Sequence, residues 1–172
     1  MTLIKSRLAL PFLVLAIAGL SVSFPAVGWA EAPLAAPVAP NWKLADLDGH
    51  AVGSEQLKGK VVILDFWATW CGPCVGEIAG YIELQKKHAA EGLVIVGVSV
   101  DQAGPEVVRK FVKAKGINYV VAMADDAVTD AFGGMDAIPT TFLIDRAGRI
   151  INRKVGAMPH EEYAKLVEQA LR

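Results

Sequence analysis

Two hydrophobic patterns alternate along the chain from residue 60 onward. Mostly apolar runs at 60–67 and 93–100 predict two strands that are buried on both faces, at the centre of a sheet. After each run, apolar residues recur at the spacing of an amphipathic helix, over about 74–91 and 105–115. Glycine follows each of these helical segments and predicts its end. Strands and helices in alternation predict an α/β fold.

The segments on either side complete this pattern. A strand, a helix, two strands joined by a turn and a final amphipathic helix are predicted at 119–123, 126–132, 138–144, 149–155 and 160–172. Upstream, residues 42–47 alternate in polarity before an Asp-Gly pair that is typical of a hairpin turn. We therefore predict a central mixed β-sheet flanked by helices, with an N-terminal β-hairpin and an antiparallel pair of strands near the C-terminus.

Residues 1–30 have the composition of an export signal. Two basic residues precede an apolar stretch at 8–20, and the segment closes on Gly28-Trp29-Ala30, whose small residues fit a cleavage site after Ala30. The alternative is an uncleaved membrane anchor, because residues 8–30 exceed the roughly 20 residues that span a bilayer as a helix. We expect a cleaved signal and a protein that works in the periplasm or elsewhere outside the cytoplasm.

The part beyond the signal has the size and composition of one domain. Residues 31–40 are rich in alanine and proline and are predicted to form a linker, and 41–172 make up the domain. The chain is 53% hydrophobic and 20% charged, which is enough apolar material for a core. Loss of the signal's two basic residues would take the net charge from −1 to −3, and no basic patch indicates a nucleic-acid partner. We expect a monomer that binds no nucleic acid.

The candidate chemistry lies in a Cys-Gly-Pro-Cys motif at 71–74, which contains both cysteines of the chain. The motif stands where the strand at 60–67 leads into a helix. The first turn of a helix leaves N–H groups unpaired and favours negative charge, which lowers the pKa of a thiol there below about 8.5. A thiolate opens disulfides, and a second cysteine one turn later can resolve the mixed disulfide. The motif therefore predicts a redox-active pair.

A Cys-x-x-Cys pair can also bind zinc or form a purely structural disulfide. Zinc would need two further ligands, and the three histidines, His50, His88 and His160, are scattered along the chain. A structural disulfide is the other alternative, but it would close a very short loop, for which the entropic gain is small. We expect no metal and no cofactor beyond the disulfide itself.

The chain resembles the thioredoxin superfamily, and more closely the exported thiol–disulfide oxidoreductases of the TlpA/ResA type. The resemblance covers about 41–172. It rests on Asp-Phe-Trp-Ala-Thr-Trp-Cys-Gly-Pro-Cys at 65–74, on Glu77, and on Ile-Pro-Thr-Thr-Phe-Leu-Ile-Asp at 138–145. It implies a thioredoxin-like fold. Family members often have proline two residues after the glutamate, where this chain has Ala79, so the resemblance does not carry over a kink in that helix.

The resemblance also implies roles for individual residues. Cys71 would be the exposed attacking thiol and Cys74 the buried resolving thiol. Pro139 would be a cis-proline facing the pair, with an ordinary turn proline as the alternative. The backbone of Ile138 would then pair with an extended segment of a client protein. For Trp70, ordinary packing is the alternative to an exposed lid. The candidate client-contacting residues are Trp70, Gly72, Pro73 and Ile138.

Two acids near the motif are candidates for proton transfer. Asp65 interrupts the buried strand where thioredoxin has its buried aspartate, and Glu77 takes the place of the TlpA/ResA glutamate, with a solvated glutamate as the alternative. Burial raises the pKa of a carboxyl group, and two neighbouring carboxyl groups titrate as a pair. One of them could take the proton from Cys74 as it attacks the mixed disulfide. We expect Asp65 to be the more buried and Glu77 the nearer to solvent.

These features predict a thiol–disulfide oxidoreductase that reduces protein disulfides. Gly-Pro between the cysteines resembles thioredoxin, with a potential of about −270 mV, rather than strong oxidants near −120 mV. The implied partners are disulfide-containing clients, an apocytochrome c among them, and a membrane thiol-transfer protein as electron donor. One alternative is a thioredoxin-fold peroxidase, although its Pro-x-x-x-Thr-x-x-Cys pattern does not precede Cys71. The other is a copper-binding chaperone, which would need a third ligand near the pair.

Overall fold

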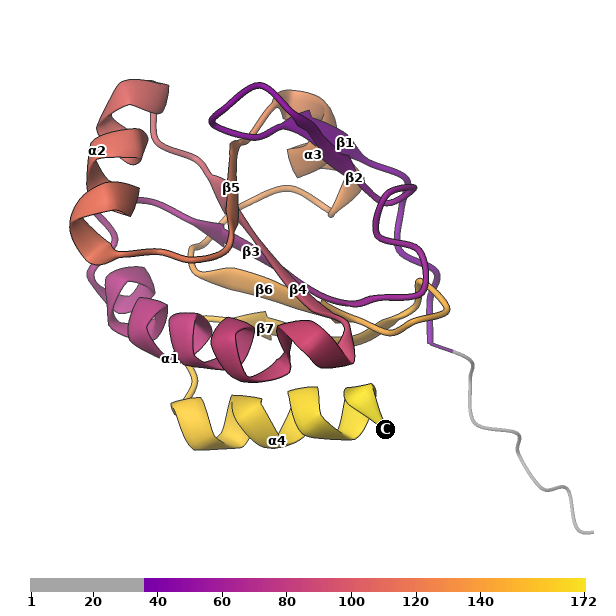
Figure 1. The fold of residues 1–172 in the computed structure, drawn as a ribbon. Helices are drawn as coiled ribbons and strands as arrows, with labels where there is room; N and C mark the ends of the chain where they lie inside the picture. The colour runs from indigo at the N-terminus through magenta and orange to yellow at the C-terminus, as the bar shows by residue number, and fades with distance from the viewer. Residues whose placement is uncertain (1–35) are drawn as a thin grey trace, which may run out of the picture. The chain divides into compact units, whose positions relative to one another are not determined.

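The computed structural model describes residues 36–172 (Figure 1). The signal or anchor predicted at 1–30 and the first half of the predicted linker lie outside the described residues. The strands and helices in chain order are β1 (Lys43–Ala45), β2 (Ala51–Gly53), β3 (Val61–Trp67), α1 (Gly72–His88), the short 3-10 helix η1 (Ala89–Glu91), β4 (Leu93–Ser99), α2 (Pro105–Lys115), β5 (Val120–Met123), α3 (Asp126–Ala131), β6 (Thr140–Ile144), β7 (Ile150–Val155) and α4 (His160–Leu171).

Five strands form the central sheet, in the order β5-β4-β3-β6-β7. β3 is parallel to β4 and antiparallel to β6, and β6 is antiparallel to β7, so the sheet is mixed. β1 and β2 pair separately as an antiparallel hairpin. The predicted fold class, with its N-terminal hairpin and its antiparallel pair near the C-terminus, is confirmed.

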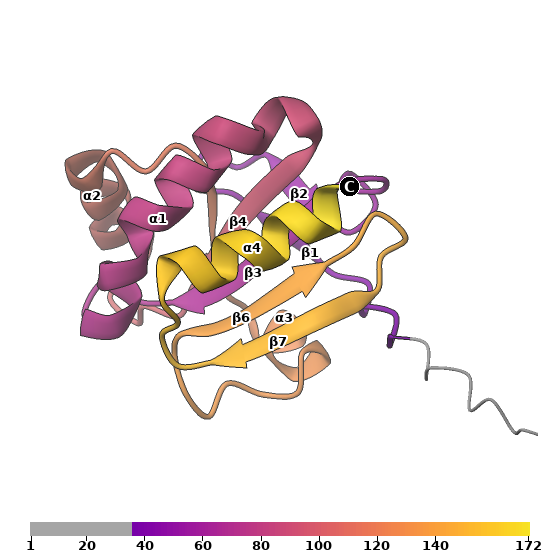
Figure 2. The same cartoon turned by 90° about the horizontal axis from the view of Figure 1, so that it is seen from below.

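Both faces of the sheet are covered, which explains why every residue of β3 is buried. Val62, Leu64 and Phe66 point toward the side of the β1-β2 hairpin and α3. Val61 and Ile63 point toward α1 and α4, which lie side by side across the other face (Figure 2). A continuous apolar run suits a strand in this position, because both sets of alternating side chains enter a core.

The helix after β3 begins two residues earlier than the sequence predicts. It starts at Gly72 rather than near residue 74, and Pro73 lies in its first turn. Proline suits this position because its fixed φ angle is helical and no helical hydrogen bond is lost there. As a consequence, Cys71 is the N-cap residue of α1, and the cysteine pair spans the first turn of the helix.

Candidate active site

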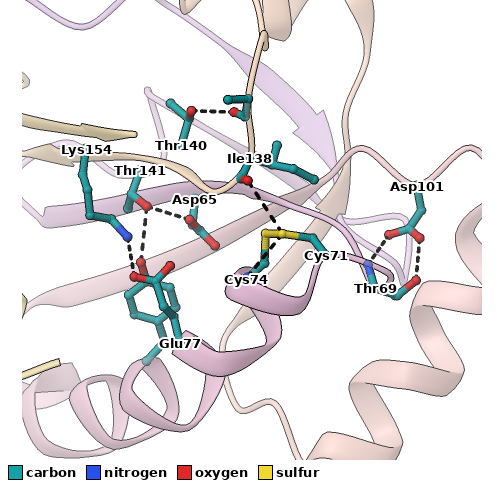
Figure 3. The surroundings of a disulfide bond; sticks show 12 residues. Asp65, Thr69, Cys71, Cys74, Glu77, Asp101, Ile138, Thr140, Thr141 and Lys154 are labelled. Atoms are coloured by element: carbon teal, nitrogen blue, oxygen red, sulfur yellow. Dashed lines mark hydrogen bonds and ion pairs between the residues drawn. A yellow bond between two sulfur atoms is a disulfide. The ribbon is translucent and has the colours of Figure 1, made fainter. Parts of the chain in front are cut away.

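Cys71 and Cys74 are joined by a disulfide at the N-terminus of α1 (Figure 3). The sulfur of Cys71 accepts a hydrogen bond from the backbone N–H of Cys74 over 3.3 Å. In the reduced protein, the same N–H and the positive end of the helix dipole would stabilise negative charge on this sulfur. Cys71 is therefore better placed than Cys74 to be a thiolate.

The disulfide is less exposed than the sequence predicts. Cys71 retains 6% of its accessible surface and Cys74 retains 2%. Cys71 is the more exposed of the two, as predicted. The prediction that its thiol is exposed was wrong, because Cys71 caps α1 and packs against the segment around Ile138. The residues around it are open: Trp70 is 68% exposed, and Gly72 and Pro73 are exposed as well.

The segment before β6 faces the cysteine pair. The Ile138–Pro139 peptide bond is cis, as predicted. The carbonyl oxygen of Ile138 lies 3.8 Å from the sulfur of Cys71 (Figure 3). The Pro139 carbonyl accepts a hydrogen bond from Gly156 N–H over 2.8 Å, which ties this segment to the end of β7. The fold thus brings together two sequence blocks that lie 67 residues apart.

Asp65 is buried in the middle of the sheet beneath α1. Its Oδ1 accepts a hydrogen bond from the hydroxyl of Thr141 over 2.7 Å, and the hydroxyl of Tyr81 lies 3.3 Å from that of Thr141. Figure 3 shows the carboxyl group between Thr141 and Cys74. Burial raises the pKa of Asp65 to about 7, with the negative charge of Glu77 adding to it, while the Thr141 hydrogen bond and the charge of Lys154 oppose the rise.

Glu77 points into the same region from α1 and is less buried than Asp65, as predicted. Its Oε1 forms an ion pair with Lys154 and accepts the backbone N–H of Met158 over 3.1 Å. Its Oε2 is buried and has no hydrogen-bond partner among the described residues. Glu77 also lines a cavity of about 60 Å³, which is large enough for water. The side chain of Glu77 is 11% exposed and is held by Lys154 and Met158, so it is not a freely solvated surface glutamate.

A third carboxylate, that of Asp101, binds the residues just before Cys71 on the side away from Asp65. Its Oδ2 accepts the backbone N–H of Thr69 over 2.9 Å, and its Oδ1 accepts the hydroxyl of Thr69 over 2.5 Å. The hydroxyl of Ser99 also donates to Asp101, over 2.8 Å. Asp101 is buried and lies two residues beyond the end of β4. These bonds fix the turn that carries Trp70 and Cys71.

Sequence reasoning missed Thr141, Lys154, Tyr81 and Asp101 as parts of the site. Lys154 occupies an inward-facing position of β7, whose residues alternate in burial, but the sequence Ile-Ile-Asn-Arg-Lys-Val does not alternate in polarity and gives no signal of this. Thr141 belongs to the second sequence block of the resemblance, but nothing in the sequence shows that it faces Asp65.

Residues 36–172 contain neither a metal-binding cluster nor a helix that could span a membrane. No group of three or more His, Cys, Asp or Glu side chains within this range is arranged to hold a metal ion. None of the helices described in this range is long and apolar enough to cross a membrane.

Comparison with known proteins places the chain in a family. The model of the Redoxin family matches residues 34–171, which is most of the chain. The chain belongs to the redoxin family. Within it, thiol–disulfide oxidoreductase ResA of Bacillus subtilis (strain 168) is 37% identical over 135 residues, covering 76% of this chain and 74% of ResA. ResA of Bacillus anthracis is 34% identical over 124 residues, covering 72% of this chain and 71% of that protein.

Solved structures similar to this redoxin are also thiol–disulfide exchange proteins. A crystal structure of a thiol:disulfide interchange protein of the thioredoxin family from Chlorobium tepidum TLS has a TM-score of 0.76 and 35% identity, and covers 82% of this chain and 100% of that one. The predicted membership, fold and activity class are confirmed: this redoxin is a thiol–disulfide oxidoreductase of the ResA type with a Cys71–Cys74 pair.

Proposed function

We propose that the protein reduces disulfides of other proteins outside the cytoplasm, with Cys71 as the attacking thiolate. One observation carries the proposal: the sulfur of Cys71 caps α1, accepts the Cys74 N–H, and lies 3.8 Å from the Ile138 carbonyl. A client disulfide that reaches this sulfur meets an activated nucleophile and a free backbone acceptor at the same point.

The exchange proceeds in two steps that balance. The Cys71 thiolate attacks one client sulfur, and the second client sulfur leaves as a thiolate and takes a proton from solvent. Cys74 then gives its proton to the Asp65 carboxylate and attacks the sulfur of Cys71. The first client sulfur leaves in turn and is protonated. Two electrons pass to the client, which becomes a dithiol, and the Cys71–Cys74 disulfide forms.

The surface around the disulfide suits an unfolded or extended client. Trp70 presents a large, exposed aromatic face beside Cys71, and Gly72 and Pro73 add no bulky side chain that would block approach. Ile138 offers a backbone carbonyl for strand-like pairing with the client. In this role Pro139 positions that carbonyl, and Trp70, Gly72, Pro73 and Ile138 form the client-contacting surface.

The location and the partners follow from the predicted export signal at 1–30. A reductant outside the cytoplasm must be re-reduced, so a membrane thiol-transfer protein is proposed as the electron donor. Clients are proteins that need free thiols, and an apocytochrome c is the candidate. The protein works as a monomer and binds no nucleic acid.

Trapping tests the assignment of the two cysteines. Cys74→Ala is expected to accumulate a mixed disulfide with a disulfide-containing client, because Cys71 still attacks and nothing resolves the product. Cys71→Ala is the matched control and is expected to form none. In the reduced parent protein, iodoacetamide is expected to modify Cys71 first. Faster modification of Cys74, or a mixed disulfide on Cys74 in the Cys71→Ala variant, would reverse the assignment.

A further inference from the structure

Lys154 is a buried lysine beside the proton-transfer site. Its side chain is 4% exposed, which is unusual for an ammonium group because burial removes its hydration. Within the described residues its ion-pair partner is Glu77, and its ammonium nitrogen also lies 5.6 Å from the centre of the Tyr163 ring. A buried charge retained in this way is expected to have a specific electrostatic task.

The sheet register aligns Lys154 with Asp65. Asp65 on β3 is directly opposite Thr141 on β6, and Thr141 is directly opposite Lys154 on β7. Directly opposite residues point to the same face of a sheet, so all three side chains lie on the face that α1 covers. The side chain of Glu77 extends from α1 toward these three residues and forms an ion pair with Lys154 (Figure 3). One positive and one negative charge are thereby fixed next to the buried carboxyl group.

We propose that Lys154 is a positioning residue for disulfide exchange: its ammonium group anchors Glu77 and balances the negative charge that Glu77 places beside Asp65. The proposal rests on the proposed role of Asp65 as the proton acceptor for Cys74. Lys154 touches neither cysteine, and it acts through Glu77 and Asp65.

The other groups that face Asp65 carry no charge in the working pH range. They are the hydroxyl of Thr141 on β6, Cys74, which is held in the disulfide of the oxidised protein, and three tyrosines, Tyr81 on α1, Tyr119 before β5 and Tyr163 on α4. Burial raises the pKa of each tyrosine well above its usual value of 10, so all three stay neutral. Glu77 and Lys154 are thus the charged side chains that act on Asp65 in the described structure. Glu77 raises the pKa of Asp65 and Lys154 lowers it.

Because Glu77 and Lys154 carry opposite charges, removing one or the other should shift the pKa of Asp65 in opposite directions. A merely structural role of Lys154 predicts no such pair of shifts. In Lys154→Met, Glu77 has no counter-charge, so the pKa of Asp65 is expected to rise. In Glu77→Gln, Lys154 has no counter-charge, so the pKa of Asp65 is expected to fall. The double variant is expected to return close to the parent value, and Lys154→Arg, which keeps the charge, is expected to stay near it. Lys165→Met removes the same charge from an exposed position and is the matched control.

The measurement is the NMR titration of the Asp65 side-chain carboxyl carbon in the oxidised protein, together with the pH midpoint of mixed-disulfide resolution. The titration needs no catalysis, so it tests the charge balance even if Asp65 is not the proton acceptor. If Asp65 is the acceptor, the kinetic midpoint follows the titration. A Lys154→Met protein that titrates like its Lys165→Met control, or shifts of the same sign in Lys154→Met and Glu77→Gln, would overturn the proposal. If Lys154→Met does not fold, the comparison of Glu77→Gln with the double variant still decides, because adding Lys154→Met must then raise the Asp65 pKa.

Discussion

The hydroxyl of Thr141 donates a hydrogen bond to the carboxyl group of Asp65 over 2.7 Å, and both residues are buried. They face each other across β3 and β6, and Thr141 is two residues beyond Pro139. The segment that carries Ile138 and Pro139 therefore leads directly into the strand that holds Thr141 against Asp65. In the proposed mechanism, client contact and proton transfer therefore depend on neighbouring parts of one segment.

Removing this hydroxyl is expected to change the titration of Asp65. Thr141→Val keeps the shape of the side chain but loses a hydrogen bond that favours the ionised carboxylate, so the pKa of Asp65 should rise above about 7. The free energy of unfolding should fall by about 1–3 kcal/mol, because the buried Tyr81 hydroxyl loses its partner. Thr140→Val is the control, since the Thr140 hydroxyl donates to Ala137 instead. NMR titration of Asp65 is the measurement, and an unmoved pKa would contradict the account.

Replacing the buried acid itself is expected to stabilise the protein at alkaline pH. The pKa of Asp65 rises from 3.8 to about 7 on folding, so the folded state holds the proton more tightly. The contribution of this carboxyl group to the free energy of unfolding is fully present below pH 3.8 and is lost as the pH rises to about 7. The free energy of unfolding of Asp65→Asn should therefore exceed that of the parent by up to roughly 4 kcal/mol at pH 8, and by much less at pH 4. Urea unfolding at both pH values checks this, and equal stabilities at pH 8 would disprove it.

Glu77 is expected to act on the reaction through Asp65. Its negative charge raises the pKa of Asp65 and so makes that carboxylate a stronger base. Glu77→Gln should slow the resolution of mixed disulfides at pH 8, by less than Asp65→Asn does. The double variant should lose less than the sum of the two single losses. Single-turnover rates of the four proteins measure the coupling, and strictly additive losses would show that the two acids act independently.

The bonds from Asp101 to Thr69 are expected to hold the turn before Cys71. Asp101→Asn keeps the size of the side chain but weakens charge-assisted hydrogen bonds, so the free energy of unfolding should fall by about 1–3 kcal/mol. The Thr69 amide should lose protection from hydrogen exchange, and client reduction should slow because Trp70 and Cys71 are less well positioned. Asp130→Asn, at an exposed position, is the control. Unchanged protection at Thr69 would argue against this role.

The fold could be predicted almost completely from the sequence, because its signals are local. The strand predicted at 60–67 is observed as Val61–Trp67, and the helix predicted at 160–172 is observed as His160–Leu171. The run of mostly apolar residues sets the bounds of the strand, and the amphipathic spacing sets those of the helix, without reference to the rest of the chain. The early start of α1 at Gly72 depends on the capping by Cys71, which periodicity does not show.

The site could be predicted only where its residues belong to one motif. Cys71, Cys74 and Glu77 are within seven positions of one another. Thr141 lies 76 residues from Asp65, and its contact depends on the β3–β6 register. Lys154 was missed because lysine is seldom buried, so a lysine in an edge strand is ordinarily assigned to the surface. The small exposure of Cys71 also depends on a distant segment, the one around Ile138.

The pH dependence of mixed-disulfide resolution tests the central claim, that Asp65 takes the proton from Cys74. A mixed disulfide with thionitrobenzoate is formed on Cys71 at pH 5, and a stopped-flow jump to pH 5.5–9 releases the coloured thiol. The parent rate should rise with pH and level off above a midpoint near 7, the pKa of Asp65. In Asp65→Asn the rate at pH 8 should be on the order of 10²-fold lower and should rise only as the Cys74 thiol ionises, near or above about pH 8.5. Superimposable profiles for the two proteins would show that Cys74 loses its proton to another base.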